Sequence, residues 1–247
     1  MTPISAPLLE HVELLCLDAG NTILFLDHAR VAAVLTSAGL CANATSVERA
    51  EGQTKRLYED GSLLNPTWCE QNTPGAVSWA RLHATLMHCA GCPVPRLPEL
   101  LDALWTEHRK RNLYHLVPQG LANALLRLRT RGVQVAVVSN SEGTLEELLD
   151  SLGLVFDTVI DSGRVGVEKP EPRIFELALE RTHTTADHAL HLGDSFPADI
   201  VGARLAHLRA ALIDPFGHLA GRHPDVPRVP GVVEVAEQLG HAKPTPS

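Results

Sequence analysis

The sequence predicts an α/β protein in which a doubly wound parallel sheet carries an inserted helical domain. Two short apolar runs, VELLCL at 12–17 and VQVAVV at 133–138, are bounded by turn residues, as buried parallel strands are. Between these runs the sequence shows helical periodicity and no strand-like alternation. From about residue 116 onward, strands alternate with amphipathic helices, an order that builds a parallel sheet with right-handed crossovers and helices on both faces.

The first predicted strand ends at Asp18, and the segment 26–113 that follows is predicted to be an all-helical insertion, called the cap below. Apolar residues recur at helical spacing in four parts of this segment, 29–40, 46–60, 75–92 and 97–113. The prediction therefore divides the chain into a core, a cap and a tail. The core consists of residues 1–25 and 114–240, the cap of residues 26–113, and a disordered tail of residues 241–247.

The core elements alternate after the cap. We expect helices at 119–132, 144–154, 171–182 and 198–208, and strands at 133–140, 157–161, 188–194 and 209–214. Thr144 and Glu147 have the spacing of a capping box, so the helix at 144–154 is expected to begin with that pair. Pro172 suits the first turn of the helix at 171–182 because its missing N–H would have no partner there.

The net charge limits the classes of function. A formal charge of −8 and a pI near 5.9 do not favour binding to nucleic acid or to a membrane surface. No apolar run approaches the roughly 18 residues that cross a bilayer, and the first fifteen residues lack a basic leader. We therefore expect a cytoplasmic protein without nucleic-acid or membrane partners, in which local positive groups or a metal ion hold any anionic substrate.

The five cysteines are scattered and odd in number, which is not the pattern of a disulfide framework. Cys89 and Cys92 form a CxxC with His83 and His88 nearby. No second pair completes the set of about four ligands that zinc requires. We interpret Cys89 and Cys92 as reduced thiols at a helix end.

Polar side chains follow four of the predicted strands. Asp18 follows the first strand, Ser139 and Asn140 the second, Lys169 the loop after the third, and Asp194 the fourth. Ligands of open parallel sheets bind beyond the carboxyl ends of the strands, so these groups are expected to form one site. Each of them alone is also explained as a helix cap, a turn residue or a solvated lysine. Those explanations do not predict one such group for each strand.

The chemistry of the set indicates phosphoryl transfer. Asp18 and Asp194 offer carboxylate oxygens to Mg²⁺, which commonly binds one or two carboxylates together with a substrate phosphate. A carboxylate whose approach to phosphate is eased by a metal can act as a nucleophile. Ser139 can donate a hydrogen bond to a phosphoryl oxygen, and Lys169 can offset negative charge in the transition state.

At these residues the chain resembles the haloacid dehalogenase-like (HAD) hydrolase superfamily over nearly its whole length. The four motifs of that superfamily correspond in order and spacing to LLCLDAGNTIL, VAVVSNS, GRVGVEKPEPRIF and HLGDSFPADIVGA. The third is similar to the form found in capped phosphoglycolate-phosphatase-like members. The resemblance implies a Rossmann-like core with a helical cap between the first and second motifs.

The resemblance also implies roles for individual residues. Asp18 would form an aspartyl-phosphate, Ser139 would bind the phosphoryl group, and Lys169 would stabilise the nucleophile and the intermediate. Mg²⁺ would be held by Asp18, the carbonyl group of Gly20, Asp194 and Asp199, with Asp199 either a ligand or the holder of a metal-bound water. Thr22 and Asn140 would contribute to binding of a small phosphorylated substrate.

Gly20 departs from the family pattern. Phosphatases of the family have an aspartate there, which protonates the leaving alcohol and later activates water, and such general acid–base catalysis typically contributes ~10²–10⁴-fold. Glycine keeps the carbonyl group that the metal needs and lacks the acid. A phosphatase with this turn would be slow, would require good leaving groups, or would use another acid such as Asp27 or His28.

Two other classes of function remain open. Family members without the second aspartate include dehalogenases and phosphonatases, but dehalogenation does not need the metal-binding carboxylates of GDSFPAD. A phosphonatase needs a cap lysine, for which Lys55 and Lys110 are the candidates. The third class is a catalytically weak member that acts as a binding or regulatory protein, although a pure binder has no evident need for all four site residues. The oligomeric state is not predicted.

Overall fold

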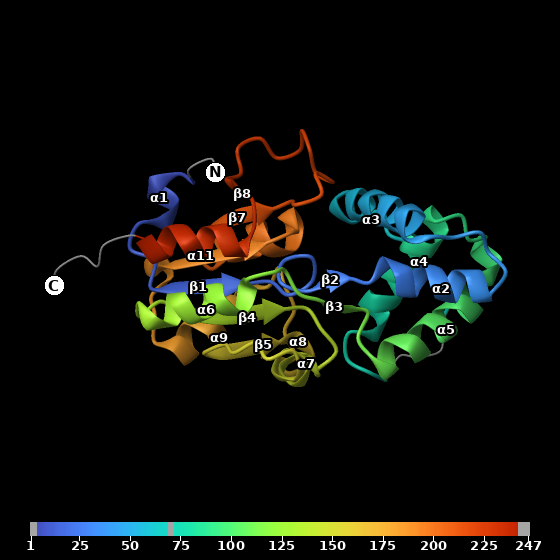
Figure 1. The fold of residues 1–247 in the computed structure, drawn as a ribbon, viewed down its shortest axis with the longest axis horizontal. Coiled ribbons are helices and arrows are strands. Elements are labelled where there is room, and N and C mark those ends of the chain that lie inside the picture. Colours follow the sequence, from blue (N-terminus) through green and yellow to red (C-terminus); the bar gives the residue numbers. More distant parts are fainter. Residues whose placement is uncertain (1–3, 69–71, 242–247) are drawn as a thin grey trace. The chain divides into compact units, whose positions relative to one another are not determined.

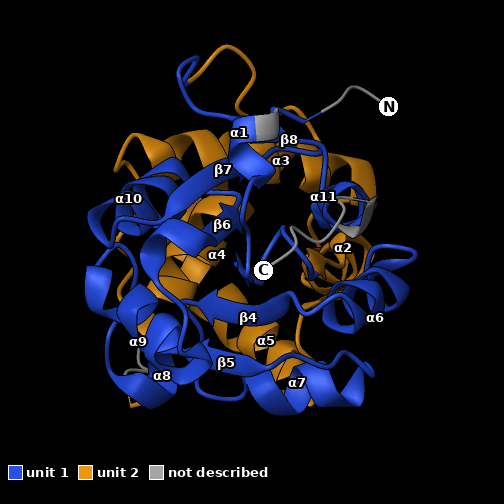
Figure 2. Ribbon diagram, turned by 90° about the vertical axis from the view of Figure 1, so that its left-hand side faces the viewer, with its two compact units in different colours: residues 1–24, 117–215, 223–247 blue, residues 25–116, 216–222 orange. Residues whose placement is uncertain are grey.

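The computed structural model describes residues 4–68 and 72–241, and these form two compact units. Unit 1 consists of residues 1–24, 117–215 and 223–247, and unit 2 of residues 25–116 and 216–222 (Figure 2). The sequence placed 216–222 in the core, whereas this segment groups with the cap. The tail expected at 241–247 lies outside the described residues except for His241, which ends a helix.

Unit 1 is built on a six-stranded sheet in which every neighbouring pair is parallel (Figure 1). The order of the strands is β5-β4-β1-β6-β7-β8. β1 is central, and all four of its residues are buried, which explains why its sequence is a continuous apolar run. The strands are β1 (Leu14–Leu17), β4 (Gln134–Ser139), β5 (Thr158–Asp161), β6 (Ala189–Gly193), β7 (Arg209–Ile213) and β8 (Arg228–Val229).

Helices cover both faces of this sheet. α6 and α11 lie on one face, and α9 and α10 lie on the other (Figure 2). The predicted doubly wound α/β fold is therefore confirmed. The helices of unit 1 are α1 (Ala6–Leu9), α6 (Leu121–Thr130), α7 (Leu145–Ser151), α8 (Ser162–Val165), α9 (Pro172–Thr182), the 3₁₀-helix η2 (Ala186–His188), the π-helix η3 (Phe196–Val201), α10 (Gly202–Leu205) and α11 (Val232–His241).

The predicted capping box at Thr144 is wrong. Thr144 is the N-cap residue of α7, but its side chain makes no capping hydrogen bond. The N–H of Leu145 donates instead to Oδ2 of Asp161, at 3.0 Å. A carboxylate from the end of β5 thus replaces the local cap, and this tertiary contact has no signature in the residues of the helix.

Unit 2 is mainly helical, and it also contains a small antiparallel ribbon at the two ends of the segment 26–113 that was predicted to be helical. The ribbon pairs β2 (Phe25–Leu26) with β3 (Tyr114–Leu116), and strands this short are below the length at which alternation can be recognised. The helices are α2 (His28–Ser37), α3 (Ala44–Glu59), α4 (Ala76–Cys89), the 3₁₀-helix η1 (Val94–Arg96) and α5 (Leu97–Lys110). No helix among the described residues is long and apolar enough to cross a membrane.

The segment 216–222 packs onto α3 and β2 of unit 2. The Phe216 ring meets the Phe25 ring edge-on, with centroids 5.7 Å apart. Arg222 binds both carboxylate oxygens of Asp60, at 2.7 and 3.1 Å, and Arg56 donates to the carbonyl of His218 at 3.2 Å. These contacts are between residues distant in sequence, so the local pattern does not predict them.

Two buried histidines give unit 2 an expected sensitivity to acid. Burial lowers the pKa of His83 to about 4 and the pKa of His108 to about 3. Below about pH 6.5 the unfolded chain binds protons at these residues that the folded chain does not bind, so the free energy of unfolding falls as the pH falls. At about pH 5 each histidine should cost this unit roughly 2 kcal/mol relative to pH 7.

Intrinsic fluorescence measures this effect, because all three tryptophans, Trp68, Trp79 and Trp105, lie in unit 2. Urea titrations at about pH 7 and pH 5 should show the loss in wild type and a smaller loss in His108→Gln, which cannot take up the proton. Equal pH sensitivity in the two proteins would contradict the assignment to His108.

Candidate active site

The four predicted strand-end groups belong to unit 1, and the strand order brings them to the same edge of the sheet. β1 lies between β4 and β6, so Asp18 after β1, Ser139 at the end of β4 and Asp194 after β6 are neighbours. The N–H of Asp18 donates to the carbonyl of Leu192 at 2.9 Å, which continues the pairing of β1 with β6. Asp18, Ser139 and Lys169 are buried, and Asp194 is half-buried.

Lys169 connects two of the carboxylates. Its Nζ donates to Oδ1 of Asp18 at 2.5 Å and to Oδ1 of Asp199 at 2.6 Å. Burial works against the charged ammonium group, but the two carboxylates outweigh it and hold the pKa of Lys169 above its ordinary value. Lys169 is therefore a fixed positive charge against the Asp18 carboxylate.

The carboxylates differ in their electrostatic environment. Burial, together with the charges of Asp199 and Asp194, raises the pKa of Asp18 to about 7 against the opposing effect of Lys169. Burial also disfavours the charge on Asp199, but Lys169 and His191 hold the pKa of Asp199 well below its usual range. Three carboxylates beside one ammonium group leave an excess of negative charge that a cation would relieve.

The carboxylate oxygens fit a divalent metal ion. Asp18, Asp194 and Asp199 each offer one oxygen, and these atoms lie within 4.8 Å of one another. Carboxylate oxygens are the ligands that Mg²⁺ and other hard cations prefer. The charge, donor type and clustering therefore agree with the metal site expected from the sequence.

The turn after Asp18 contains Gly20 and Thr22. It is closed by hydrogen bonds from the N–H of Asn21 to the carbonyl of Leu24 at 2.7 Å and from the N–H of Leu24 to the carbonyl of Ala19 at 2.9 Å. Gly20 pairs with Leu24 in an isolated bridge. The buried hydroxyl of Thr22 has no hydrogen-bond partner within 4–68 and 72–241. The predicted contribution of Thr22 to substrate binding remains a prediction.

Asn140 joins the loop after β4 to the loop that carries Lys169. Its Nδ2 donates to the carbonyl of Lys169 at 3.0 Å, and its Oδ1 accepts from the N–H of Lys169 at 2.7 Å. Both ends of the carboxamide are thus engaged with the Lys169 backbone. The side chain of Asn140 positions Lys169, and its predicted contribution to substrate binding remains a prediction.

Asp161 is a supporting residue that the sequence interpretation missed. Its buried carboxylate accepts from three backbone N–H groups, those of Gly143 at 3.0 Å, Leu145 at 3.0 Å and Gly163 at 2.9 Å. The first two belong to the segment that follows Ser139 and Asn140. Asp161 also ends β5, so its position at a strand end is the same signal that identified Asp18 and Ser139.

Gly163 allows the loops after β4 and β5 to approach closely. A Cβ atom at this position would lie 2.5 Å from the backbone N of Gly143 and 2.8 Å from the carbonyl oxygen of Ser141. We expect Gly163→Ala to displace the loop after Ser139 and to lower the free energy of unfolding by about 1–3 kcal/mol, as overpacking of a tight contact does. Urea titration followed by circular dichroism is the appropriate measurement, since the tryptophans lie in unit 2.

Gly231→Ala is a matched control for this prediction. A Cβ atom there would meet Oε2 of Glu234 at 2.8 Å, and the end of that flexible side chain can move away. Equal stability of the two alanine variants would contradict the close-approach explanation for Gly163.

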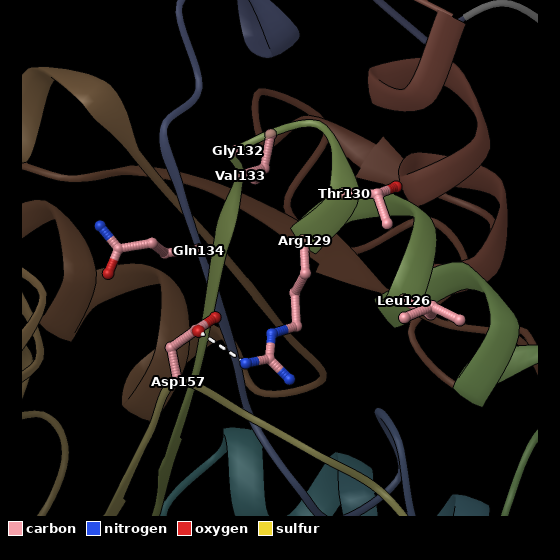
Figure 3. Close-up of a pocket in the computed structure, with 7 residues that line it drawn as sticks. All are labelled: Leu126, Arg129, Thr130, Gly132, Val133, Gln134 and Asp157. Carbon is pink, nitrogen blue, oxygen red and sulfur yellow. Dashed lines mark ion pairs between the residues drawn. The ribbon is translucent and has the colours of Figure 1, made fainter.

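A hollow of about 370 Å³ lies at the opposite edge of the sheet (Figure 3). It is lined by the end of α6, by Gln134 at the start of β4 and by Asp157 just before β5. Arg129 forms an ion pair with Asp157 across it, at 3.3 Å. The hollow is therefore at the amino ends of the strands, whereas Asp18 and Ser139 are at the carboxyl ends, and it is not part of the candidate site.

Comparison with known proteins agrees with this geometry. A family model for haloacid dehalogenase-like hydrolases matches residues 12–207. The phosphoserine phosphatase of Thermus thermophilus is 31% identical over 226 residues, which cover 82% of this chain and 89% of that protein.

Two solved structures extend the comparison to the fold. A HAD-hydrolase of Bacillus subtilis bound to magnesium superposes with a TM-score of 0.65 at 20% identity, over 92% of this chain and 98% of that one. The L-2-haloacid dehalogenase of Xanthobacter autotrophicus superposes with a TM-score of 0.57 at 17% identity, over 94% of this chain and 100% of that one. At these identities the likeness establishes the fold and does not decide the reaction.

Proposed function

The chain belongs to the haloacid dehalogenase-like hydrolase family, and we propose that it is a Mg²⁺-dependent phosphatase that hydrolyses a small phosphorylated metabolite through Asp18. The observation that carries this proposal is the contact of the Lys169 ammonium group with Asp18 and Asp199, beside Asp194. This arrangement holds a nucleophilic carboxylate, a fixed positive charge and a set of metal ligands at one place. The Thermus thermophilus relative, named a phosphoserine phosphatase, supports the same class of reaction.

In the proposed reaction a carboxylate oxygen of Asp18 attacks phosphorus, and the bond from phosphorus to the leaving alcohol oxygen breaks. Water then attacks the aspartyl-phosphate at phosphorus, which releases inorganic phosphate and restores the carboxylate. Lys169 holds the attacking oxygen in place and offsets charge on the phosphoryl group, to which Ser139 would donate a hydrogen bond.

Mg²⁺ would be held by Asp18, Asp194 and the Gly20 carbonyl, with Asp199 as a ligand or as the holder of a metal-bound water, and would supply neutralisation of phosphate charge. Asp18 must be ionised to attack, and burial raises its pKa to about 7. Positive charge in the site favours the ionised form.

The proton for the leaving alcohol has two candidate sources besides solvent, and both belong to unit 2. Asp27 accepts from the N–H of Arg30 at 3.0 Å as the N-cap of α2, and it lies 3.5 Å from Nε2 of His115. His28 pairs with Glu51 at 2.6 Å. Burial lowers the pKa of His28, but pairing with Glu51 outweighs burial and raises it. Both side chains are already engaged within unit 2, Asp27 as a helix cap and His28 with Glu51, so neither is assigned as the donor.

The alternatives have weaker support. A phosphonatase would need a cap lysine that loses its proton, yet Lys110 is exposed and pairs with Glu107 at 2.5 Å. A dehalogenase would have no evident need for the carboxylates that cluster around Lys169. A binding protein would have no need for a buried ammonium group against a nucleophilic oxygen.

The proposal is tested by a phosphate-release screen over metabolite phosphates, an aryl phosphate and an acyl phosphate, each with Mg²⁺ and with EDTA. We expect Mg²⁺-dependent release, fastest for substrates with good leaving groups. No release from any phosphate in a protein that binds Mg²⁺ would favour the binding protein. Release of chloride from a 2-haloacid would establish the dehalogenase.

A further inference from the structure

His191 is a polar residue at the centre of an apolar strand, and the proposed reaction does not use it. It lies in the middle of β6 with no exposed surface, between Leu190 and Leu192, which point to the opposite face of the sheet. The Phe175 ring packs edge-on against the imidazole, with centroids 5.0 Å apart. Nε2 of His191 lies 3.1 Å from Oδ1 of Asp199.

The contacts of the ring determine which nitrogen carries the hydrogen. An imidazole ring carries hydrogen on at least one of its two nitrogens. Its Nδ1 has no hydrogen-bond partner among the residues the structure describes. An ionised Asp199 can only accept, so Nε2 carries the hydrogen and donates it to Oδ1.

Asp199 is held on every side by such contacts. Oδ1 accepts from both Lys169 and His191, and Oδ2 accepts from the N–H of Ser195 at 2.9 Å. Gly193 leaves no free space beside the carboxylate, because a Cβ atom there would overlap it. The orientation of Asp199 therefore depends on a small number of donors, one of which is His191.

The position of Lys169 depends on Asp199 in turn. Its Nζ lies between Oδ1 of Asp199 and Oδ1 of Asp18, at 2.6 and 2.5 Å. Rotation of the Asp199 carboxylate would move one of the two anchors of the ammonium group. A methionine at 191 would fill a similar volume but has no hydrogen-bond donor. Oδ1 of Asp199 would then accept from Lys169 alone.

We propose that His191 is a positioning residue for phosphoryl transfer, which acts through Asp199 to fix the ammonium group of Lys169 against Asp18. The kinetic consequence rests on the proposed phosphatase function, whereas the structural coupling does not. His191 touches neither the nucleophile nor, in the proposed reaction, the substrate.

The kinetic test compares His191→Met, which lacks the donor, with His191→Gln, whose Nε2 can still donate to Asp199. We expect kcat to fall on the order of tenfold to a hundredfold in the methionine variant, as displacement of a positioned group does, with little change in KM. The glutamine variant should recover most of kcat. Leu190→Met, on the opposite face of the same strand, is the control for core substitution and should remain close to wild type.

A second test needs no turnover. The chain has only four lysines, so the ¹⁵N-lysine spectrum is simple, and the buried ammonium signal is assigned by its loss in Lys169→Met. We expect this signal to shift in His191→Met and to stay near its wild-type position in His191→Gln and Leu190→Met. We also expect the wild-type His191 ring to show hydrogen on Nε2.

The outcomes separate the two hypotheses. An unmoved Lys169 signal in folded His191→Met, or the absence of hydrogen on Nε2 of His191, would overturn the positioning role. An unchanged kcat in the methionine variant of an active enzyme would do the same. If wild type showed no turnover but the lysine signal shifted as expected, the proposed phosphatase function would be wrong and the coupling of His191 to Lys169 would still hold.

Discussion

Asp18→Asn is expected to abolish phosphate release, with a loss of at least about 10³-fold in kcat. Asparagine has nearly the same shape as aspartate but lacks the anionic oxygen that would attack phosphorus. The fold should survive the change, because the amide oxygen can still accept from Lys169. It also removes a buried charge that the site disfavours, as shown by the raised pKa of Asp18, about 7. The comparison of kcat with thermal unfolding separates lost chemistry from lost structure.

Asp150→Asn is a control for the loss of one negative charge in the same unit, since Asp150 is exposed on α7. Its kcat should equal that of wild type. An acid-quenched reaction with labelled substrate should leave phosphate on wild type and none on Asp18→Asn. Turnover near the wild-type rate in a verified Asp18→Asn protein would mean that another residue is the nucleophile.

The sequence was sufficient to predict the layers of the fold, because buried parallel strands leave short apolar runs such as those ending at Leu17 and Val138. It also predicted which of their terminal residues meet, since parallel topology brings the carboxyl ends of the strands to one edge. The ribbon of β2 and β3 was not predicted, because strands of two or three residues are too short to show an alternation of apolar and polar residues. The placement of 216–222 in unit 2 was not predicted, because it depends on contacts such as that of Arg222 with Asp60, which are far apart in sequence.

The residues that hold the candidate site in place were harder to predict from the sequence than its reactive groups. Asp161 follows the same strand-end rule as Asp18, but it turns back to cap α7 and the loop after β4 instead of facing a ligand. The contacts of His191 and Lys169 with Asp199 depend on which face of β6 meets the π-helix η3. Periodicity states that a residue is buried on one face, but it does not state which side chain it meets there.

Replacement of Gly20 by an acidic residue is expected to increase phosphatase activity. Gly20→Asp is expected to raise kcat on alkyl phosphates by up to ~10²-fold, the lower part of the range for general acid–base catalysis. The gain on an aryl phosphate should be small, because that leaving group departs without a proton. Gly20 is not among the described glycines with a positive φ, so an aspartate there meets no backbone strain, whereas its neighbour Asn21 has φ 54°.

One further variant decides whether the gain comes from the acid. Gly20→Asn adds a side chain of the same size without a proton to donate, and it should not raise the alkyl rate. If folded Gly20→Asp, with Mg²⁺ affinity intact, hydrolysed alkyl esters no faster than wild type, the proton would not limit the reaction. The turn at Gly20 would then be suited to acyl or aryl phosphates, whose leaving groups need no acid. A selective gain on alkyl esters would instead show that the nucleophile, lysine and metal ligands are already competent and that the missing carboxylate limits their rate.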